Sequence, residues 1–360
     1  LMAELVALEL LRGLLRQRVA GSTIAYNSAI SACERGQRWQ EAVSLLTQCQ
    51  ERRVELDVIS FSGAISACEK GGEWRLALFL LCRMPILRVM PDVISLNAAL
   101  SACEKSGQWQ LAFALLGRMP EYQVKSDLVS CSAVISSCEK AGKWRLALDL
   151  LSGMLLCRMT PDVIAWNAGI SACEKGGQWQ AALALLTGMS EYRSKPNVRS
   201  CNAAISACEK GEEWQQAMAL VCNLLHQGTS PTIITFNAAM SACEKCGRLE
   251  PSLILLRQAS RCGLELDVVT YNSAVRTCET SRRSCKVNPP AGPEVLLVAL
   301  LTQMQLMALA LVAEMEELAI QPNALTYSSV MNVIEGSGGR RLLPGLAERL
   351  SASGAGELAA

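Results

Sequence analysis

Histidine and excess charge are both scarce in this sequence. The only histidine is His226, and no glycine-rich loop of the phosphate-binding kind is present. A single histidine gives no convincing Ser-His-Asp or Cys-His array, so we expect neither an enzyme nor a cofactor. The 34 basic and 33 acidic residues leave a net charge of +1, which excludes attraction of the whole molecule to a polyanion or a membrane surface. Any polyanion binding must therefore come from a local arrangement.

Cysteine, by contrast, is abundant, and eight of the 17 cysteines follow one fixed spacing. These eight lie 35 residues apart, at Cys33, Cys68, Cys103, Cys138, Cys173, Cys208, Cys243 and Cys278. A period of this length predicts stacked supersecondary units. Because the eight recur at one helical position and free cysteine is often buried, we expect reduced, packed thiols in a reducing compartment.

One repeat, residues 58–92, shows the predicted local structure. Its first half carries an apolar helical stripe of Phe61, Ala64, Ile65 and Cys68. A second stripe follows a Gly-Gly break and consists of Trp74, Ala77, Leu78, Leu81 and Met84. Pro91 ends the second helix, and Asp92 stands at the N-cap position of the next one. Each repeat is therefore predicted to be an antiparallel helix pair that buries its faces by stacking on its neighbours.

The cysteine spacing also divides the chain. Residues 1–22 read as the second half of a preceding repeat, so we expect the natural N-terminus upstream of Leu1, and no targeting signal is readable. Seven contiguous repeats occupy residues 23–267. An eighth, at 268–323, has about 21 extra residues near 281–301, including the loop-like SCKVNPPAGP. Residues 324–360 are expected to form a degenerate capping repeat and a tail.

The segment from Val295 to Ala313 carries no charge and is long enough to span a membrane. Gln303 and Gln305 interrupt it, however, and the repeat frame continues through it to Pro322. We therefore expect a buried repeat helix and no membrane association, with insertion as the alternative.

The repeat text resembles a known family. The V-I-S-F-S start of the second repeat is followed by Lys70 and Gly72 at the turn, Ala77 inside the second helix, Met84 near its end, and a closing Pro-Asp pair. This pattern is similar to the pentatricopeptide repeat (PPR), over nearly the whole chain. The resemblance implies an all-α fold, an α-solenoid of about nine helix pairs wound as a right-handed superhelix. It also implies binding of single-stranded RNA, one base per repeat.

By this resemblance, the fifth and last residues of each repeat read the base. The fifth residues are Asn27, Ser62, Asn97, Ser132, Asn167, Asn202, Asn237 and Asn272. The last residues are Asp57, Asp92, Asp127, Asp162, Asn197, Thr232, Asp267 and Asn323. The second residue is a wedge that sandwiches the base, at Ile24, Ile59, Ile94, Val129, Ile164, Arg199, Ile234 and Val269. Arg199 departs from the apolar pattern, although a guanidinium plane can also stack on a base.

The chemistry of these side chains suits a base code. An ionised Asp only accepts hydrogen bonds, and uracil and guanine carry a ring N–H on the Watson–Crick edge. By the family pattern, Asn with Asp reads U, Ser with Asp reads G, and Asn with Asn or Thr reads a pyrimidine. The implied target from the first to the eighth repeat is 5′-UGUGYYUY-3′.

Simpler interpretations compete for several of these residues. The Asp residues at the last position could serve only as helix N-caps. Capping does not explain the Asn at the fifth position, because Asn inside a helix lowers stability relative to Ala and its recurrence indicates another role. Seven basic residues are candidate phosphate contacts: Arg35, Lys70, Lys105, Lys140, Lys175, Lys210 and Lys245. They could equally complement the helix dipole, and the glutamate before each nearly cancels its charge.

Two further motifs are interpreted as structural. Six tryptophans open the second helices and are expected to be core residues, not stacking platforms: Trp39, Trp74, Trp109, Trp144, Trp179 and Trp214. Cys243 and Cys246 form a lone C-x-x-C, and because no second pair lies nearby in the sequence we expect no metal site.

The sequence thus favours a monomeric adaptor that binds RNA and blocks nucleases, remodels local RNA structure or recruits an RNA-processing protein. By family resemblance it would act on transcripts in the chloroplast or mitochondrion. The alternative is a helical scaffold whose groove holds a peptide.

Overall fold

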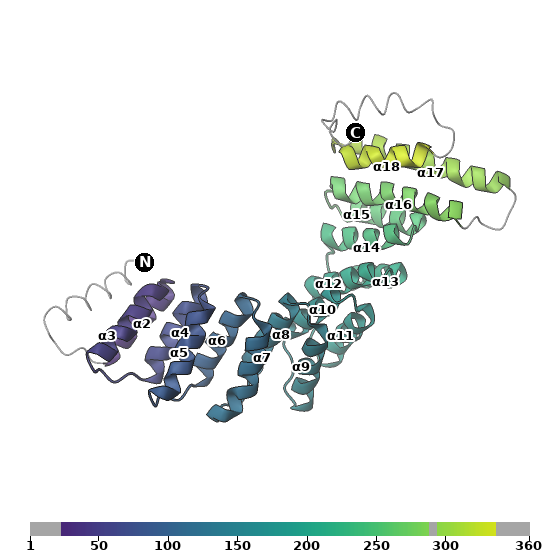
Figure 1. The fold of residues 1–360 in the computed structure, drawn as a ribbon. Helices are drawn as coiled ribbons and strands as arrows, with labels where there is room; N and C mark the ends of the chain where they lie inside the picture. Colours follow the sequence, from purple (N-terminus) through teal and green to yellow (C-terminus); the bar gives the residue numbers. More distant parts are fainter. Residues whose placement is uncertain (1–22, 288–293, 336–360) are drawn as a thin grey trace. The chain divides into compact units, whose positions relative to one another are not determined.

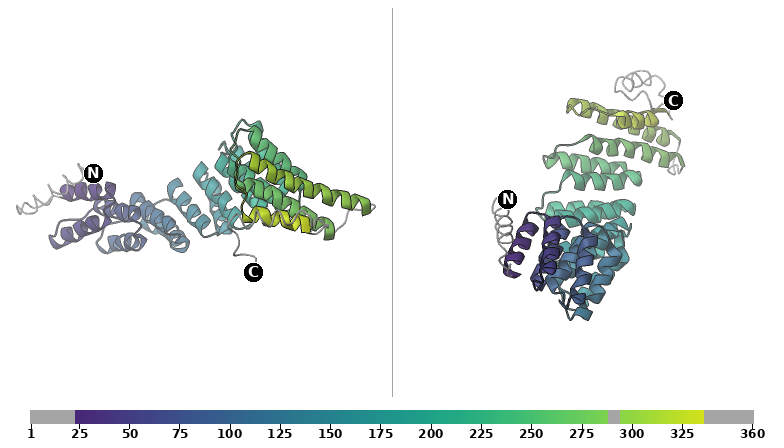
Figure 2. Two further views of the ribbon diagram at one scale, coloured as in Figure 1. Left: turned by 90° about the horizontal axis from the view of Figure 1, so that it is seen from above. Right: turned by 60° about the vertical axis from the view of Figure 1, so that its left-hand side comes forward.

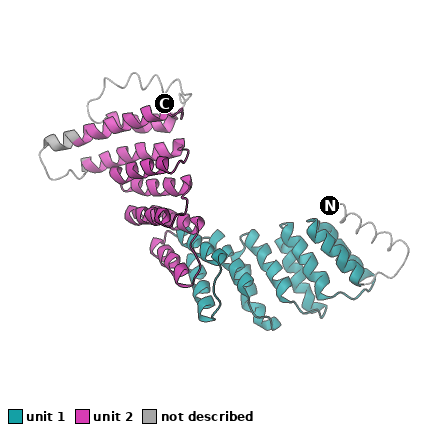
Figure 3. Cartoon of the chain, turned by 180° about the vertical axis from the view of Figure 1, so that it is seen from behind, with its two compact units in different colours: residues 1–176 teal, residues 177–360 magenta. Residues whose placement is uncertain are grey.

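The computed structural model describes residues 23–287 and 294–335, and every regular element in this part of the chain is a helix (Figure 1). The chain divides into two compact bodies, residues 1–176 and 177–360 (Figure 3). Each body is a stack of helix pairs. The expected all-α solenoid is therefore confirmed. The predicted half-repeat at 1–22 and the tail beyond residue 335 lie outside the described residues.

In the N-terminal body the first helices of the repeats pack on one another in chain order. They are α2 (Thr23–Arg35), α4 (Val58–Lys70), α6 (Val93–Lys105), α8 (Leu128–Lys140) and α10 (Val163–Lys175). The second helices are α3 (Trp39–Glu51), α5 (Trp74–Ile86), α7 (Trp109–Arg118) and α9 (Trp144–Leu156). A 3₁₀ turn, η1 (Met119–Tyr122), follows α7 and contains Pro120, which lacks the N–H that a regular helix would use.

The C-terminal body repeats this arrangement, with α12, α14, α16 and α18 packed in order (Figure 2). Its helices are α11 (Trp179–Glu191), α12 (Val198–Lys210), α13 (Trp214–His226), α14 (Ile233–Lys245), α15 (Leu249–Arg261), α16 (Val268–Val287), α17 (Glu294–Glu317) and α18 (Ala324–Glu335). The first helices from α2 to α16 begin at the 35-residue period of the cysteines.

The turn inside each pair follows from local backbone chemistry. After α4, Gly72 takes the left-handed conformation at φ 78°, which glycine adopts at little cost. The Glu73 N–H then donates to the Cys68 carbonyl at 2.9 Å, satisfying a carbonyl at the end of the helix. The chain reverses there, and the second helix lies against the first.

The cysteine ladder is buried as expected. All eight ladder cysteines have no exposed surface, and all seventeen cysteines are free thiols. Burial raises the pKa of the Cys68 and Cys173 thiols to about 11, and that of Cys278 to about 12. Since the thiolate is the reactive form, these residues are packing elements that mark the buried side of each first helix.

The six tryptophans correct an expectation. They are only partly buried, because each opens a second helix at the edge of its repeat. A Cβ added to Gly71 would lie 2.3 Å from Cδ1 of Trp39, and one on Gly211 would lie 2.2 Å from Cδ1 of Trp179. The indole rings therefore pack against the turn of the following repeat and join neighbouring repeats at the surface.

The eighth repeat has a longer first helix than the repeats before it. Of the loop-like segment expected at 284–293, residues 284–287 continue α16, which extends to Val287 and has 20 residues where the first helices from α2 to α14 have 13, and residues 288–293 lie outside the described residues. Its partner α17 has 24 residues. The extra turns bring the buried Arg282 to the end of α18, where its guanidinium donates to the carbonyls of Asn332 and Val333. Extension of the helices thus absorbs the described part of the insertion.

The uncharged segment forms part of α17. Met304, Ala308, Leu311 and Met315 make its buried face, while Leu306 is exposed. The expected buried repeat helix is thus buried along one face only. Among the described residues, no helix combines the length and the apolar character that crossing a membrane requires.

The difference in burial among the cysteines can be measured with a thiol-labelling reagent at pH 7.5. We expect the exposed Cys82, Cys157 and Cys262 to be modified at least tenfold faster than any ladder cysteine, because the latter lack both access and thiolate. Peptide mapping by mass spectrometry checks this. In denaturant all sites should react at similar rates; equal rates in the folded protein would contradict the buried ladder.

Candidate functional site

The fifth residue of a first helix meets the last residue of its own repeat. Asn27 Nδ2 donates to both carboxylate oxygens of Asp57 at 3.0 Å. Asn97 donates to both oxygens of Asp127 at 3.2 Å. The sequence separation in each pair is 30 residues, so these contacts form only because consecutive helix pairs stack in register.

Two further pairs are also joined directly. Ser132 Oγ donates to Asp162 Oδ1 at 3.4 Å, and Asn272 Nδ2 donates to Asn323 Oδ1 at 3.3 Å. The Asn272–Asn323 pair spans the extra residues of the eighth repeat, whose longer helices leave its two readers in contact.

The remaining pairs differ. Ser62 Oγ donates to the Ile59 carbonyl of its own helix at 3.2 Å, and no bond to Asp92 forms. Asn202 and Asn237 each accept a hydrogen bond from a hydroxyl of the following helix, and Asn237 also hydrogen-bonds Asp267, which helps to lower the pKa of that carboxyl. Asn167 belongs to the N-terminal body and Asn197 to the C-terminal body.

The last residues are also helix caps, as the simpler interpretation expected. Asp57 Oδ1 accepts from the Ser60 N–H at 2.9 Å, and Asp92, Asp127 and Asn197 form the same capping box with a serine. A cap of this kind contributes about 1 kcal/mol. Capping leaves the second carboxylate oxygen available, and in Asp57 that oxygen faces Asn27. The cap and the paired contact therefore coexist in one side chain.

Hydrogen bonds lower the pKa of three of the last-residue carboxylates, Asp57, Asp127 and Asp267. Burial alone would raise the pKa of Asp57, but bonds from Ser60 and Asn27 outweigh it and lower the pKa below its ordinary value. The same competition lowers the pKa of Asp127 and Asp267. A lowered pKa in the folded state stabilises the fold above the ordinary carboxyl range, and this contribution is lost as the pH falls through the folded pKa. At neutral pH each is an acceptor only.

The wedge residues lie on the surface beside these pairs. The seven apolar wedges, Ile24, Ile59, Ile94, Val129, Ile164, Ile234 and Val269, are between 56% and 76% exposed. Arg199 is exposed as well. Single exposed apolar side chains are normal in proteins. A large apolar side chain at the same position in seven repeats instead gives each of these repeats an exposed apolar contact on the same first helix as the fifth residue.

The candidate phosphate contacts form an ion-pair ladder between repeats. Each pair joins a lysine to the glutamate 36 residues earlier: Lys70–Glu34 at 2.9 Å, Lys105–Glu69 at 2.9 Å, Lys140–Glu104 at 3.3 Å, Lys175–Glu139 at 3.2 Å and Lys245–Glu209 at 3.0 Å. Arg276 continues the ladder to Glu244 at 3.1 Å. Arg35 bonds the Ser31 carbonyl of its own helix. Interaction with the helix dipole therefore does not by itself account for these lysines, because they also form ion pairs that link neighbouring first helices.

Sequence reasoning missed two sets of residues. The third residue of most first helices is a fully buried Ser or Thr that contacts the readers of the preceding repeat. The sequence carried a signal for this set, because a Ser or Thr recurs at the third position of the repeat with the 35-residue period. Leu325, the second residue of α18, is 63% exposed and occupies the wedge position of the repeat assigned as a cap.

The other residues considered for metal binding or catalysis do not come together in the part of the chain that the structure describes. Among residues 23–287 and 294–335, no three His, Cys, Asp or Glu side chains cluster as metal ligands would. Cys243 is buried with its pKa raised to about 12, and Cys246 Sγ donates to the Glu212 carbonyl. His226 is exposed at the end of α13.

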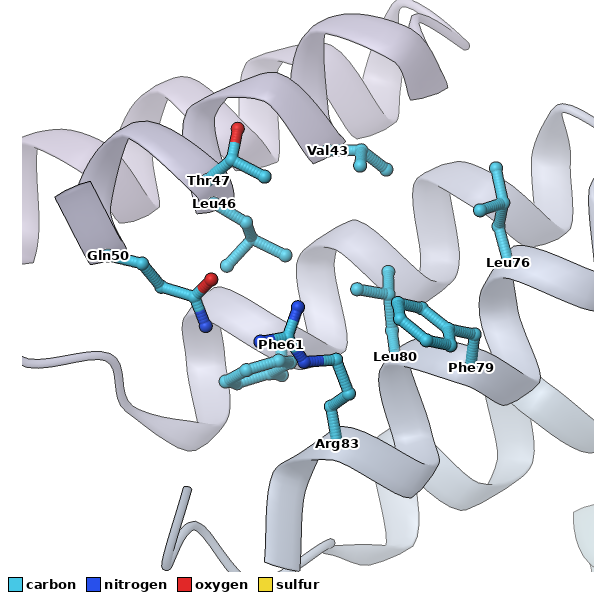
Figure 4. Close-up of a pocket in the computed structure, with 9 residues that line it drawn as sticks. All are labelled: Val43, Leu46, Thr47, Gln50, Phe61, Leu76, Phe79, Leu80 and Arg83. Atoms are coloured by element: carbon cyan, nitrogen blue, oxygen red, sulfur yellow. The ribbon is translucent and has the colours of Figure 1, made fainter. Parts of the chain in front are cut away.

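An apolar pocket lies between α3 and α5 (Figure 4). It is lined by Val43, Leu46, Thr47, Gln50, Phe61, Leu76, Phe79, Leu80 and Arg83. Figure 4 shows side chains of the two second helices facing one another across it, with Phe61 contributed by α4. None of the lining residues is a predicted reader or wedge, so the pocket is separate from the candidate site.

The stacked helix pairs and their periodic polar pairs define an α-helical repeat protein. The pentatricopeptide repeat domain matches residues 44–106, 114–177, 184–245 and 294–337, and the PPR repeat matches residues 24–54 and 94–124. The chain belongs to the pentatricopeptide repeat family. No curated protein matches the sequence.

A solved structure shows the same fold, and others were found with lower similarity. The crystal structure of the pentatricopeptide repeat protein PPR10 from maize is similar with a TM-score of 0.50 and 17% identity, covering 98% of this chain and 56% of that chain. PPR10 in complex with an 18-nt psaJ RNA element gives a TM-score of 0.47 at 17% identity, covering 91% and 55%. The PPR domain of Arabidopsis thaliana protein-only RNase P 1 in complex with tRNA gives 0.43 at 11% identity, covering 55% and 94%. The chain thus spans little more than half the length of PPR10.

The ladder can be tested by exchanging the charges of one pair. We expect Glu34→Lys and Lys70→Glu each to destabilise the protein, and the double variant to recover part of the loss. A coupling of about 0.2–1 kcal/mol is typical of such partly exposed pairs. Denaturant unfolding of all four proteins gives the coupling, because the cycle subtracts the separate effect of each charge on the helix dipole.

A matched control is Glu41→Gln, which removes the pair between Arg38 and Glu41 within a single repeat. It should leave the Lys70–Glu34 coupling unchanged. A coupling of zero that persists at low salt would contradict an energetic role for the ladder.

Proposed function

We propose that this protein binds single-stranded RNA sequence-specifically, one base per repeat. The observation that carries the proposal is the paired contact of Asn27 with Asp57, repeated at Asn97 with Asp127 and beside an exposed apolar wedge each time. An apolar side chain next to an oriented polar edge can pack against the face of an unpaired base while the polar groups hydrogen-bond its edge, and together these interactions recognise an unpaired base. Membership of the pentatricopeptide repeat family supports it.

The chemistry of each pair defines the base it prefers. The ionised Asp57 accepts hydrogen bonds only, so it suits the ring N–H of uracil or guanine. The amide of Asn27 adds a donor for a carbonyl oxygen of the base. A serine such as Ser132 is shorter than Asn and leaves more room, which suits the larger guanine. Asn in place of Asp can donate to the bare ring nitrogen of cytosine, so Asn272 with Asn323 accepts a pyrimidine.

Applied along the chain, this code gives the target 5′-UGUGYYUY-3′. We propose that the protein acts as an adaptor on organellar transcripts, in the chloroplast or mitochondrion. Bound to its site it would block nucleases, remodel local RNA structure or recruit a processing factor, without chemistry of its own. Imaging of the full-length natural protein as a fluorescent fusion tests the compartment; exclusion from both organelles would refute it.

The RNA code is tested by selection from a randomised RNA pool with purified protein. We expect enrichment of U and G at alternate positions followed by pyrimidines. The variant Asn97→Ser should change the third preferred base from U to G, because it reproduces the pair formed by Ser132 and Asp162. A pool without any enriched motif would overturn the code.

A filter-binding comparison separates RNA binding from the scaffold alternative. Poly(U) should bind better than duplex RNA, with an affinity that falls as salt is raised. Absence of binding to either RNA would favour the peptide-binding scaffold.

We further propose that the basic residues of the ladder, with Arg35 and Lys210, contact phosphates while remaining tied to the repeats. The charge-exchanged pair Glu34→Lys with Lys70→Glu keeps an ion pair but moves the positive charge to the neighbouring helix. If Lys70 contacts a phosphate, the affinity of the exchanged variant should fall by a similar factor for every RNA sequence. The slope of the logarithm of affinity against the logarithm of salt concentration should decrease in magnitude by about one. Unchanged affinity and slope would restrict the ladder to a structural role.

A further inference from the structure

The third residue of most first helices carries a hydroxyl that is fully buried. These residues are Ser60, Ser95, Ser130, Ser200, Thr235, Thr270 and Thr326, whereas Ala25 and Ala165 interrupt the series. Each hydroxyl lies beside the last residue of the preceding repeat. A buried hydroxyl requires hydrogen-bond partners, and the identity of those partners indicates what the residue does.

In four repeats the partner is the amide oxygen of a reader. Ser60 Oγ donates to Asn27 Oδ1 at 2.6 Å, and Thr235 donates to Asn202 at 2.6 Å. The same bond joins Thr270 to Asn237 at 2.7 Å and Thr326 to Asn272 at 2.5 Å. The reader lies about 33 residues earlier in the sequence or, for Thr326, 54 residues earlier, so the bond again depends on the stacking of repeats.

The direction of this bond follows from what else the hydroxyl touches. Thr235 Oγ1 accepts from the Thr232 N–H at 3.1 Å, and Thr326 Oγ1 accepts from the Asn323 N–H at 3.1 Å. With its oxygen facing a backbone donor, the Thr235 hydroxyl directs its own proton to the amide. In Ser60 and Thr270 the single hydroxyl proton is shared with a second acceptor, Asp57 Oδ1 at 2.8 Å and Asp267 Oδ1 at 2.6 Å. An asparagine that accepts through Oδ1 must turn Nδ2 to the other side. In the first repeat Nδ2 accordingly faces Asp57.

We propose that this third-residue hydroxyl is a positioning residue for base recognition, which fixes the amide orientation of the reader in the preceding repeat. The inference rests on the proposed function, because it concerns how sharply each repeat discriminates its base. A flipped amide would present a carbonyl where the base meets an N–H, and vice versa. The hydroxyl excludes the flipped state without itself touching the RNA.

The repeats are not equivalent in this respect. Ser130 Oγ donates to Asp127 Oδ1 at 2.6 Å, and the buried Asn97 Oδ1 has no hydrogen-bond partner. After the fourth repeat Ala165 offers only its backbone N–H to Asp162. Among the repeats that read with an asparagine, we therefore expect sharp discrimination in the first, sixth, seventh and eighth and weaker discrimination in the third.

Thr270 provides the test, because the seventh repeat pairs Asn237 with Asp267 and should prefer U. The variant Thr270→Val keeps the shape and removes the hydroxyl. We expect the ratio of affinities for RNAs with U and with C at the seventh base to fall roughly three- to tenfold, the effect of one lost hydrogen bond. Binding of otherwise identical RNAs, measured at one salt concentration, gives this ratio. Thr270→Ser should restore it.

A capping role alone predicts a different result. The Thr270 hydroxyl also lies 2.6 Å from Asp267 Oδ1 at the start of α16, a second acceptor that shares its single proton with Asn237, so the loss of this hydroxyl lowers thermal stability. That effect would weaken binding of both RNAs equally and leave their ratio unchanged, an outcome that overturns the inference. Ser60→Ala, read at the first base, is a second variant should Thr270→Val fold poorly.

Wild-type protein that binds U and C equally at the seventh base, while preferring single-stranded RNA, would refute the inference and leave RNA binding intact. Wild-type protein that binds no single-stranded RNA would overturn both.

Discussion

Register between neighbouring first helices is the constraint on which the candidate site depends. A single helix pair exposes apolar surface on both sides and gains stability only by stacking. Because α2, α4, α6 and α8 begin at one strict period and pack in order, the fifth residue of each falls near the last residue of its repeat. The contact between Asn27 and Asp57 is a consequence of this register. A shift of one residue in a helix would turn the reader about 100° away from its partner.

The same register gives several residues two tasks. Asp57 caps a helix and holds Asn27, while Ser60 completes the capping box and donates to the same asparagine. Capping requires an acceptor at the start of a helix, and recognition of a ring N–H requires an acceptor on the surface. One carboxylate with two oxygens meets both needs. Stability and specificity are thus coupled at this position, so substitutions there must be judged by their effect on base preference as well as on unfolding.

Much of the fold could be predicted because its determinants are local and periodic. The cysteine spacing, the glycine turns and the Pro-Asp boundaries each act within a few residues, and they predicted the starts of the helices from α2 to α15. The pairing of fifth and last residues came from family resemblance, since their 30-residue separation leaves no local signal. The loop-like composition of residues 284–293 did not predict that α16 would continue to Val287, because it does not reveal the packing of the long α16 on α17 and α18. The tryptophans were expected in the core because the apolar stripe shows which face is buried but not how far the next repeat covers it.

The amino-acid sequence by itself determined the helix pair, its 35-residue period and the family, because helix caps, turns and apolar stripes are written in neighbouring residues. Only the tertiary structure decided which polar groups meet. Lys70 could complement a helix dipole, contact a phosphate or pair with Glu34, and the stacking of repeats brings it 2.9 Å from that glutamate. Likewise, the sequence alone identifies Ser60 only as a capping residue, and the packing of the repeats places Asn27 beside it. Hydrogen bonds and ion pairs depend on distances of a few tenths of an ångström, and between repeats those distances are set by side-chain packing.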